Sequence, residues 1–202
     1  MSLFFLKSIF YMLLLFSIFL SHAAATSSTS STTISFSKYN DFNLTWSIVN
    51  ATTIEFSLAW NNSSAFDYYD WAAFGLNSSP QCSMADAEIF ICNPTPTETA
   101  TQFCQVRNSL AGFVEPAVDK QQYITLMSSS VVNGISTATF QRTLAAVSGS
   151  ELSFNITNNT MGLIYARGSW SGDSMPSGFP NQHKDVGITK VNFYGQQQQQ
   201  YA

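Results

Sequence analysis

The feature that most constrains the fold is a series of short strand-like runs separated by turn residues. In each run, apolar and polar residues alternate, or β-branched and aromatic residues concentrate, as is typical of strands that bury one face. The runs are ISFSKY, FNLTWSIV, TIEFSLAW, DWAAFGL, AEIFIC, QYITLMSSSVV, ISTATFQRTL, ELSFNIT, GLIYARGSW and ITKVNFY. No long stretch shows an amphipathic helical period. Residues 34–195 are therefore expected to form one all-β domain.

The spacing of the turns favours an antiparallel β-sandwich with immunoglobulin-like layering of two sheets. Asn133-Gly134, between SSSVV and ISTATF, is the clearest hairpin signal. A two-residue type I′ turn needs positive φ at both central residues, and the Asn-Gly pair adopts it readily.

The N-terminus has the pattern of a secretory signal peptide. Lys7 supplies a positive charge, residues 8–20 form an apolar core, and the small residues of SHAAAT suit cleavage. We expect residues 1–24 to be removed; an uncleaved signal anchor is the alternative. Residues 25–33 then form a polar Ser/Thr leader, and residues 196–202 a polar Gln-rich tail. Because this tail is not apolar, a C-terminal lipid anchor is not expected.

Charge is scarce in this chain. The formal net charge is −4, only 10% of residues are charged, and there is no basic run. This argues against nucleic acid and anionic membranes as partners. Seven N-x-S/T sequons offer glycans as another source of solubility, at Asn43, Asn50, Asn61, Asn62, Asn77, Asn155 and Asn158. The sequence thus predicts a secreted extracellular glycoprotein with no membrane span after signal cleavage.

The chain has three cysteines and no C-x-x-C motif, so neither a zinc ribbon nor a c-type haem attachment site is expected. Cys92 and Cys104 enclose a polar loop with two prolines that a disulfide could close. Cys82 is then left free or links two chains in a disulfide-bonded dimer. A Cys82–Cys92 pairing remains open at this level.

His183 is the only histidine left after signal cleavage, and it sits in a loop rich in Pro, Gly and Asn. A lone histidine is usually an ordinary surface or core residue. It has no His or Cys companion for zinc, and the chain has no G-x-S-x-G elbow for a Ser-His-Asp triad. Haem brings its own four ligands and asks the protein for two axial ones, of which His/Met is a recurring pair.

Met84 is the methionine least explained by packing, because it lies in a polar turn between two strand-like runs. Met127 and Met161 lie within or at the start of such runs and are expected to pack. Met175 is the competitor for the axial position, but it is separated from His183 by only a short loop. Such a loop would have to reach both faces of one ring.

Four segments, in this order, resemble the DOMON domain family. DWAAFGLNSSPQCSMADAEIFIC is similar to its W-x-x-x-G…M-x-x-A segment, and FVEPAVDKQQYITLMSSSVVNGISTATFQRTL to its P…D…Q-strand-N-G-strand-F-x-R pattern. GLIYARGS is similar to the family's Trp-Ala-x-Gly, with Tyr165 where Trp is usual. FPNQHKDVGITKVNF is similar to its terminal His–Gly–strand. The resemblance spans residues 34–195, and it is the order and spacing that make these weak motifs specific.

The resemblance implies a β-sandwich in a secreted protein. One branch, that of the cellobiose dehydrogenase cytochrome domain and the plant auxin-induced extracellular cytochromes, binds b-type haem between a Met and a His. By this resemblance Met84 and His183 are the axial ligands of one non-covalent haem b. Other branches, including that of dopamine β-monooxygenase-like proteins, lack haem or bind sugars.

A haem with both axial positions filled offers O₂ or peroxide no open site. The sequence therefore predicts a single-haem extracellular electron carrier that is not an enzyme and that exchanges electrons with an unidentified extracellular redox partner. Arg142, Arg167 and Lys184 are candidate partners for the haem propionates, although each is more typical of an ordinary surface cation.

The alternative function is a haem-free DOMON binding module for carbohydrate or another small ligand. Trp71, Trp170 and Tyr165 would then supply aromatic platforms.

Overall fold

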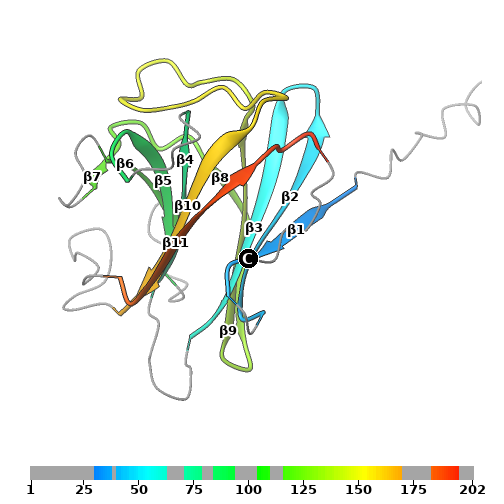
Figure 1. Cartoon of the computed structure of the whole chain (residues 1–202), viewed down its shortest axis with the longest axis vertical. Coiled ribbons are helices and arrows are strands. Elements are labelled where there is room, and N and C mark those ends of the chain that lie inside the picture. The colour runs from blue at the N-terminus through cyan, green and yellow to red at the C-terminus, as the bar shows by residue number, and fades with distance from the viewer. Residues whose placement is uncertain are drawn as a thin grey trace, which may run out of the picture.

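The structure is a computed structural model that describes residues 30–37, 40–62, 71–78, 84–93, 104–109, 116–169 and 183–195. The predicted signal peptide and Gln-rich tail lie outside these residues, as do Cys82, Met175 and Trp170. The described residues form eleven strands and no helix. The strands belong to two antiparallel sheets that pack face to face (Figure 1). The predicted all-β antiparallel sandwich is therefore confirmed.

The first sheet has five strands in the order β1-β2-β3-β9-β8. Their bounds are β1 Thr32–Ser35, β2 Phe42–Asn50, β3 Thr53–Asn61, β8 Thr125–Val132 and β9 Ile135–Thr143. The second sheet has six strands in the order β11-β10-β4-β5-β6-β7. Their bounds are β4 Trp71–Asn77, β5 Ala87–Cys92, β6 Cys104–Ser109, β7 Ala117–Val118, β10 Met161–Gly168 and β11 Asp185–Val191.

Aromatic side chains fill the space between the sheets. Phe74 of β4 and Phe90 of β5 have ring centroids 5.0 Å apart, and Phe140 of β9 lies 5.5 Å from Phe90. Phe56 of β3 joins this cluster 5.0 Å from Phe74. Since successive residues of a strand point to opposite faces, the alternation seen in the sequence directs these rings inward.

The hairpin between β8 and β9 turns as expected. Asn133 has φ of 51° and Gly134 has φ of 77°, so both central residues are in the left-handed region. Val132 pairs directly with Ile135, which leaves a two-residue loop. The Asn133-Gly134 prediction is confirmed.

The predicted disulfide between Cys92 and Cys104 is also present. The two residues are direct partners where β5 ends and β6 begins, with Cα atoms 4.1 Å apart. Both are fully buried against the aromatic core. The bond thus closes the loop between two neighbouring strands.

Three strand predictions differ from the structure. β6 and β7 were not among the predicted runs, because CQVRNS has little apolar character of its own. The predicted strand ELSFNIT, residues 151–157, does not join either sheet. The first strand begins at Thr32, so the last two residues of the predicted leader, 32 and 33, belong to it.

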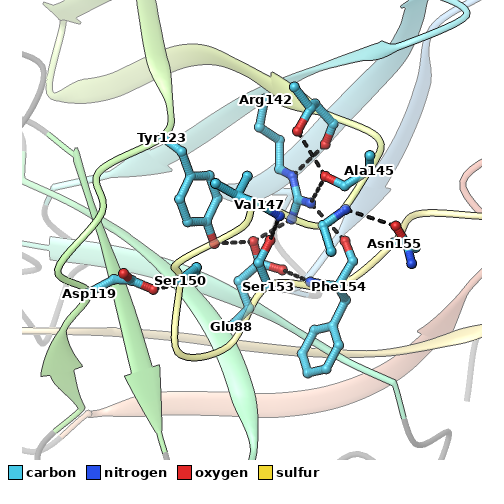
Figure 2. A network of polar contacts seen from close by, with 12 residues as sticks. Glu88, Asp119, Tyr123, Arg142, Ala145, Val147, Ser150, Ser153, Phe154 and Asn155 are labelled. Atoms are coloured by element: carbon cyan, nitrogen blue, oxygen red, sulfur yellow. Dashed lines mark hydrogen bonds and ion pairs between the residues drawn. The ribbon is translucent and has the colours of Figure 1, made fainter.

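A buried ion pair explains why residues 151–157 are not a strand (Figure 2). Arg142 of β9 and Glu88 of β5 form this pair with fully buried side chains between the two sheets. The backbone N–H of Phe154 donates to Glu88 Oε2 at 3.1 Å, and the Phe154 carbonyl accepts from Arg142 Nη2 at 2.7 Å. Side chains from both sheets therefore supply the hydrogen bonds that a strand would obtain from a neighbour.

Tyr123 completes the network by donating from its hydroxyl to Glu88 Oε1 at 2.5 Å. Burial raises the pKa of Glu88, whereas Arg142 and the donors from Tyr123 and Phe154 act in the opposite direction. Burial and the Glu88 carboxylate both raise the pKa of Tyr123. The phenol thus stays protonated and remains a donor.

Removing one partner of this pair should strongly destabilise the fold. We expect Arg142→Met to lower the free energy of unfolding by roughly 3–5 kcal/mol, because it leaves a buried carboxylate without its cation. Chemical denaturation of the purified protein measures the change. Lys120→Met is the matched control, since it removes the exposed Lys120–Glu151 pair and should leave stability unchanged. Equal effects of the two substitutions would contradict a structural role for the buried pair.

Candidate functional site

The six-stranded sheet carries apolar residues on the face that points away from the core. Alternation along β4 and β5 directs one set of side chains inward and the other outward. The outward set packs into a second apolar cluster, separate from the core. We call it the outer patch, and its members are Trp71, Ala73, Ala87, Ile89 and Ile91, with Ile164 and Ala166 packed against them.

The outer patch is closely packed along β10. A Cβ added at Gly75 would lie 2.8 Å from the Ile164 side chain, so glycine lets the isoleucine lie across β4. At the far end, a Cβ at Gly168 would lie 2.8 Å from the Trp71 indole, which also donates from Nε1 to the Ser169 carbonyl at 3.0 Å. Both glycines are needed because side chains on the outer face cover the backbone.

Met84 is half-buried and lies three residues before Ala87, the first residue of β5. Asn77, the last residue of β4, donates from Nδ2 to the carbonyl of Ala85 at 2.9 Å. This hydrogen bond ties the segment that carries Met84 to the end of β4. Met84 therefore stands beside the Ala87 end of the outer patch.

His183 is exposed and lies two residues before β11. The backbone N–H of Lys184 donates to the carbonyl of Arg167 at 3.0 Å, which fixes the chain next to His183 against β10. Arg167 is followed by Gly168, whose partner in β4 is Trp71. His183 therefore stands beside the Trp71 end of the outer patch.

The two predicted ligands lie at opposite ends of the same strands. Asn77 pairs with Gly162, while Ala72 pairs with Arg167, so five residue steps along β4 separate the two levels. At about 3.4 Å per residue these steps span about 17 Å. The described backbone does not bring Met84 and His183 into contact; it places the outer patch between their two ends of the sheet.

The other methionines have different surroundings. Met161 is 5% exposed and packs in the core, as predicted. Met127 lies on β8 in the other sheet and is 52% exposed, so its predicted packing role is wrong. β8 is an edge strand whose register shifts between Leu126 and Ser128, which leaves Met127 without a pairing partner in β9.

Arg167 fixes the His183 end of the sheet. Its Nε donates to Asp185 of β11 at 3.0 Å, and its Nη1 lies 3.2 Å from the carboxylate of Asp41, the residue before β2 of the other sheet. Its guanidinium also lies over the Phe42 ring, 5.3 Å from the centroid. Burial acts to raise the pKa of Asp41, but hydrogen bonds from Ser37 and Arg167 and the Arg167 charge hold that pKa below its ordinary value.

The buried cations correct the expectation of ordinary surface residues. Arg142 and Arg167 are 2% and 3% exposed and belong to ion pairs within the fold, so neither is an ordinary surface cation. Sequence reasoning missed Arg107, which is 3% exposed and pairs with Ile89 across β5 and β6. Alternation places Arg107 on the face of the outer patch, opposite the inward Val106. Arg107 was missed because the sequence did not indicate that β6 is a strand.

Comparison with protein families gives a match to the DOMON domain over residues 25–168. The chain belongs to the DOMON domain family. The match runs from the Ser/Thr leader to the end of β10 and does not include His183 or β11. A search of curated proteins gives no match.

Two solved structures share the DOMON fold of this chain. The cytochrome domain of cellobiose dehydrogenase from Myriococcum thermophilum has a TM-score of 0.59 and 15% sequence identity, over 81% of this chain and 82% of that one. The cytochrome b domain of pyranose dehydrogenase from Coprinopsis cinerea has a TM-score of 0.54 and 12% identity, over 78% and 79% of the two chains. At these identities the likeness establishes the common fold.

The outer patch of this DOMON domain fits an apolar planar cofactor better than the interior does. The core between the sheets is filled by aromatic rings, whereas the outer patch lies on the opposite face of the six-stranded sheet, where its five buried members are 0–7% exposed. Axial ligands bind opposite faces of a ring and must point toward each other. Met84 and His183 lie beside the two ends of this sheet face, at levels about 17 Å apart along β4.

Two of the three aromatic residues of the alternative function present no open ring face in the described structure. Trp71 is 5% exposed and covers Gly168, and Tyr165 stacks on Phe36 with ring centroids 4.2 Å apart. Trp170 lies outside the described residues. A flat sugar ring needs an exposed aromatic face, which neither Trp71 nor Tyr165 offers.

Among the described residues, no helix is long and apolar enough to cross a membrane. The same part of the chain holds no cluster of three His, Cys, Asp or Glu side chains suited to a metal ion. Both findings concern only the described residues.

The predicted sequons fall into two structural groups. Asn50, Asn155 and Asn158 are exposed, and Asn43 and Asn61 are half-buried; all five leave room for attachment at the surface. Asn62 and Asn77 are 8% and 3% exposed and serve as hydrogen-bond partners inside the fold. Asn77, the last residue of β4, therefore does not lie on an exposed loop. A glycan on either buried amide would not fit the folded domain.

Glycan mapping tests this division. In the protein secreted from a eukaryotic host, we expect Asn50, Asn155 and Asn158 to carry glycans, and Asn62 and Asn77 to be unmodified. Enzymatic deglycosylation in heavy-oxygen water, followed by peptide mass spectrometry, labels each occupied site. Occupancy of Asn77 in folded protein would contradict the described end of β4.

Asp41→Asn should cost stability in a pH-dependent way. Because the folded pKa of Asp41 is lowered from 3.8, its contribution to stability is present above that value and is lost as pH falls through the lowered folded pKa. Urea unfolding should therefore show a larger difference between wild type and variant at neutral pH than near roughly pH 3. An equal difference at both pH values would contradict the ion pair with Arg167.

Proposed function

We propose that this DOMON domain is a secreted b-type cytochrome that binds one non-covalent haem b over the outer patch. Met84 and His183 serve as the axial ligands, and the protein carries electrons outside the cell without being an enzyme. The observation that carries the proposal is the outer patch, an apolar area on the outside of the sandwich with Met84 at one end and His183 at the other. The fold shared with two cytochrome domains supports it.

A haem held by Met84 and His183 would supply one-electron transfer. Met84 contributes a thioether, which favours the reduced iron, and His183 contributes a neutral imidazole nitrogen. Ile89, Ile91 and Ala73 would exclude water from a haem bound there, which would also favour the less charged reduced state. Lys184, exposed beside His183, is the cation suited to a propionate, whereas the buried Arg107 donates to Gln105 and to the Pro116 carbonyl.

His183→Ala should abolish low-spin haem binding, because the mature protein has no other imidazole to replace it. Met84→Ala should convert a low-spin spectrum to a high-spin one, and Met84→His should keep six coordination but lower the reduction potential. The visible spectrum of the full secreted chain, supplied with haem and reduced with dithionite, measures these changes.

The controls separate the ligand assignment from general damage. Met127→Ala removes an exposed methionine from the other sheet and should leave the reduced spectrum unchanged. If Met175→Ala loses the low-spin bands while Met84→Ala keeps them, the assignment of Met84 is wrong. A wild-type protein that binds no haem would overturn the proposed function and favour a haem-free binding module.

A further inference from the structure

Within the described sheet, the surface that contains the outer patch becomes solvent-exposed toward β11. Ala73 of β4 and Ile89 of β5 are 5% and 7% exposed, and Ile164 and Ala166 of β10 are half-buried. On β11 the same face carries residues that are largely exposed, namely Val186 at 54% and Ile188 at 59%. Exposure thus rises strand by strand toward β11, the edge of the sheet.

The register makes this surface continuous. Val186 pairs with Ala166, and Ile188 pairs with Ile164, so each exposed residue adjoins a member of the outer patch. Two branched apolar side chains that are more than half exposed are a signal of an interaction site when they extend a larger apolar surface. We call the exposed face of β11 the β11 strip.

Positive charge gathers at the same edge. Lys184 and Lys190 flank the two apolar residues and are both exposed. Among the other cations of the described residues, the three arginines are buried and Lys120 lies beyond β7, at the opposite edge of the sheet. The chain as a whole has a net charge of −4, so the β11 strip differs from the rest in sign.

We propose that the β11 strip is the docking surface for a redox protein with an acidic surface. The inference rests on the proposed function, because it assigns the route by which a partner reaches the cofactor on the outer patch. An acidic partner is attracted by Lys184 and Lys190 and excluded from the rest of this acidic protein by charge repulsion. Val186 and Ile188 give the contact an apolar centre inside a charged rim.

Protection of the sheet edge explains only part of this arrangement. Lysines on an edge strand discourage pairing with another sheet, and Lys190 serves that purpose. Protection gives no reason to expose Val186 and Ile188 beside them. A small apolar centre with a charged rim instead suits a transient complex, which electron-transfer partners typically form over small areas.

Electron transfer to an acidic blue-copper protein tests the inference. The haem-loaded wild-type protein is reduced and mixed with this acceptor in a stopped-flow instrument, and the second-order rate constant should fall as salt is added. Lys190→Glu should lower the rate constant at low salt at least about threefold and weaken its salt dependence. With a basic c-type cytochrome as acceptor, the same substitution should raise the rate constant.

Two further variants locate the surface. Lys120→Glu makes the same change of net charge at the opposite edge of the sheet and should leave the rate constant close to that of wild type. Ile188→Ser should lower the rate constant at every salt concentration, because it removes apolar contact and leaves the charge unchanged. Each variant must first show the reduced low-spin spectrum of wild type.

The outcomes distinguish the two proposals. Absence of a haem spectrum in wild type overturns the proposed function, and this inference with it. A normal haem spectrum combined with equal effects of Lys190→Glu and Lys120→Glu overturns the inference alone, since net charge would then explain the rates. A normal spectrum with no effect of Ile188→Ser overturns the apolar centre of the β11 strip.

Discussion

The buried ion pair between Glu88 and Arg142 is the interaction on which the arrangement of this sandwich depends. It joins the middle of the six-stranded sheet to the five-stranded sheet, and both side chains are fully buried. A buried charge without its partner costs several kcal/mol, so the two strands cannot shift relative to each other without breaking the pair. Tyr123 and the backbone of Phe154 use the remaining donors and acceptors. The segment around Phe154 is thereby held across the open end of the core without joining a sheet.

This filled interior determines where a ligand can bind. Phe56, Phe74, Phe90 and Phe140 close the space between the sheets, and the ion pair blocks it beyond them. Between these described strands the rings leave the interior filled, so the proposed haem is assigned to the outer face of the six-stranded sheet. The outer patch is the apolar area that meets this need, because β4, β5 and β10 carry apolar residues on both of their faces. A strand in a simple two-layer sandwich would present polar residues on the outer face.

The sequence predicted the class of fold and most of its strands for a clear reason. The alternation in FNLTWSIV and TIEFSLAW and the Asn133-Gly134 turn depend only on neighbouring residues in the chain. They can therefore be recognised without knowing how the strands pair. β6 was missed because its strand character comes from its surroundings: Cys104 is bonded to Cys92, and Arg107 is buried by neighbours. Residues 151–157 were overpredicted because their hydrogen-bond partners, Glu88 and Arg142, are distant in sequence.

By itself the sequence determined the chemistry available: two histidines, one of them in the predicted signal peptide, six methionines, three cysteines, and a resemblance that predicts Met84 and His183 as ligands. Only the tertiary structure decided how these residues are arranged, because strand order and register bring together residues that are far apart in the chain. Because of the register, Met84 and His183 lie beside the two ends of the outer patch, and Asn77 is buried. Arg142 and Arg167, expected at the surface, are buried in ion pairs. The same register put Val186 and Ile188 at the open edge of the patch, since β11 has a neighbour on one side only.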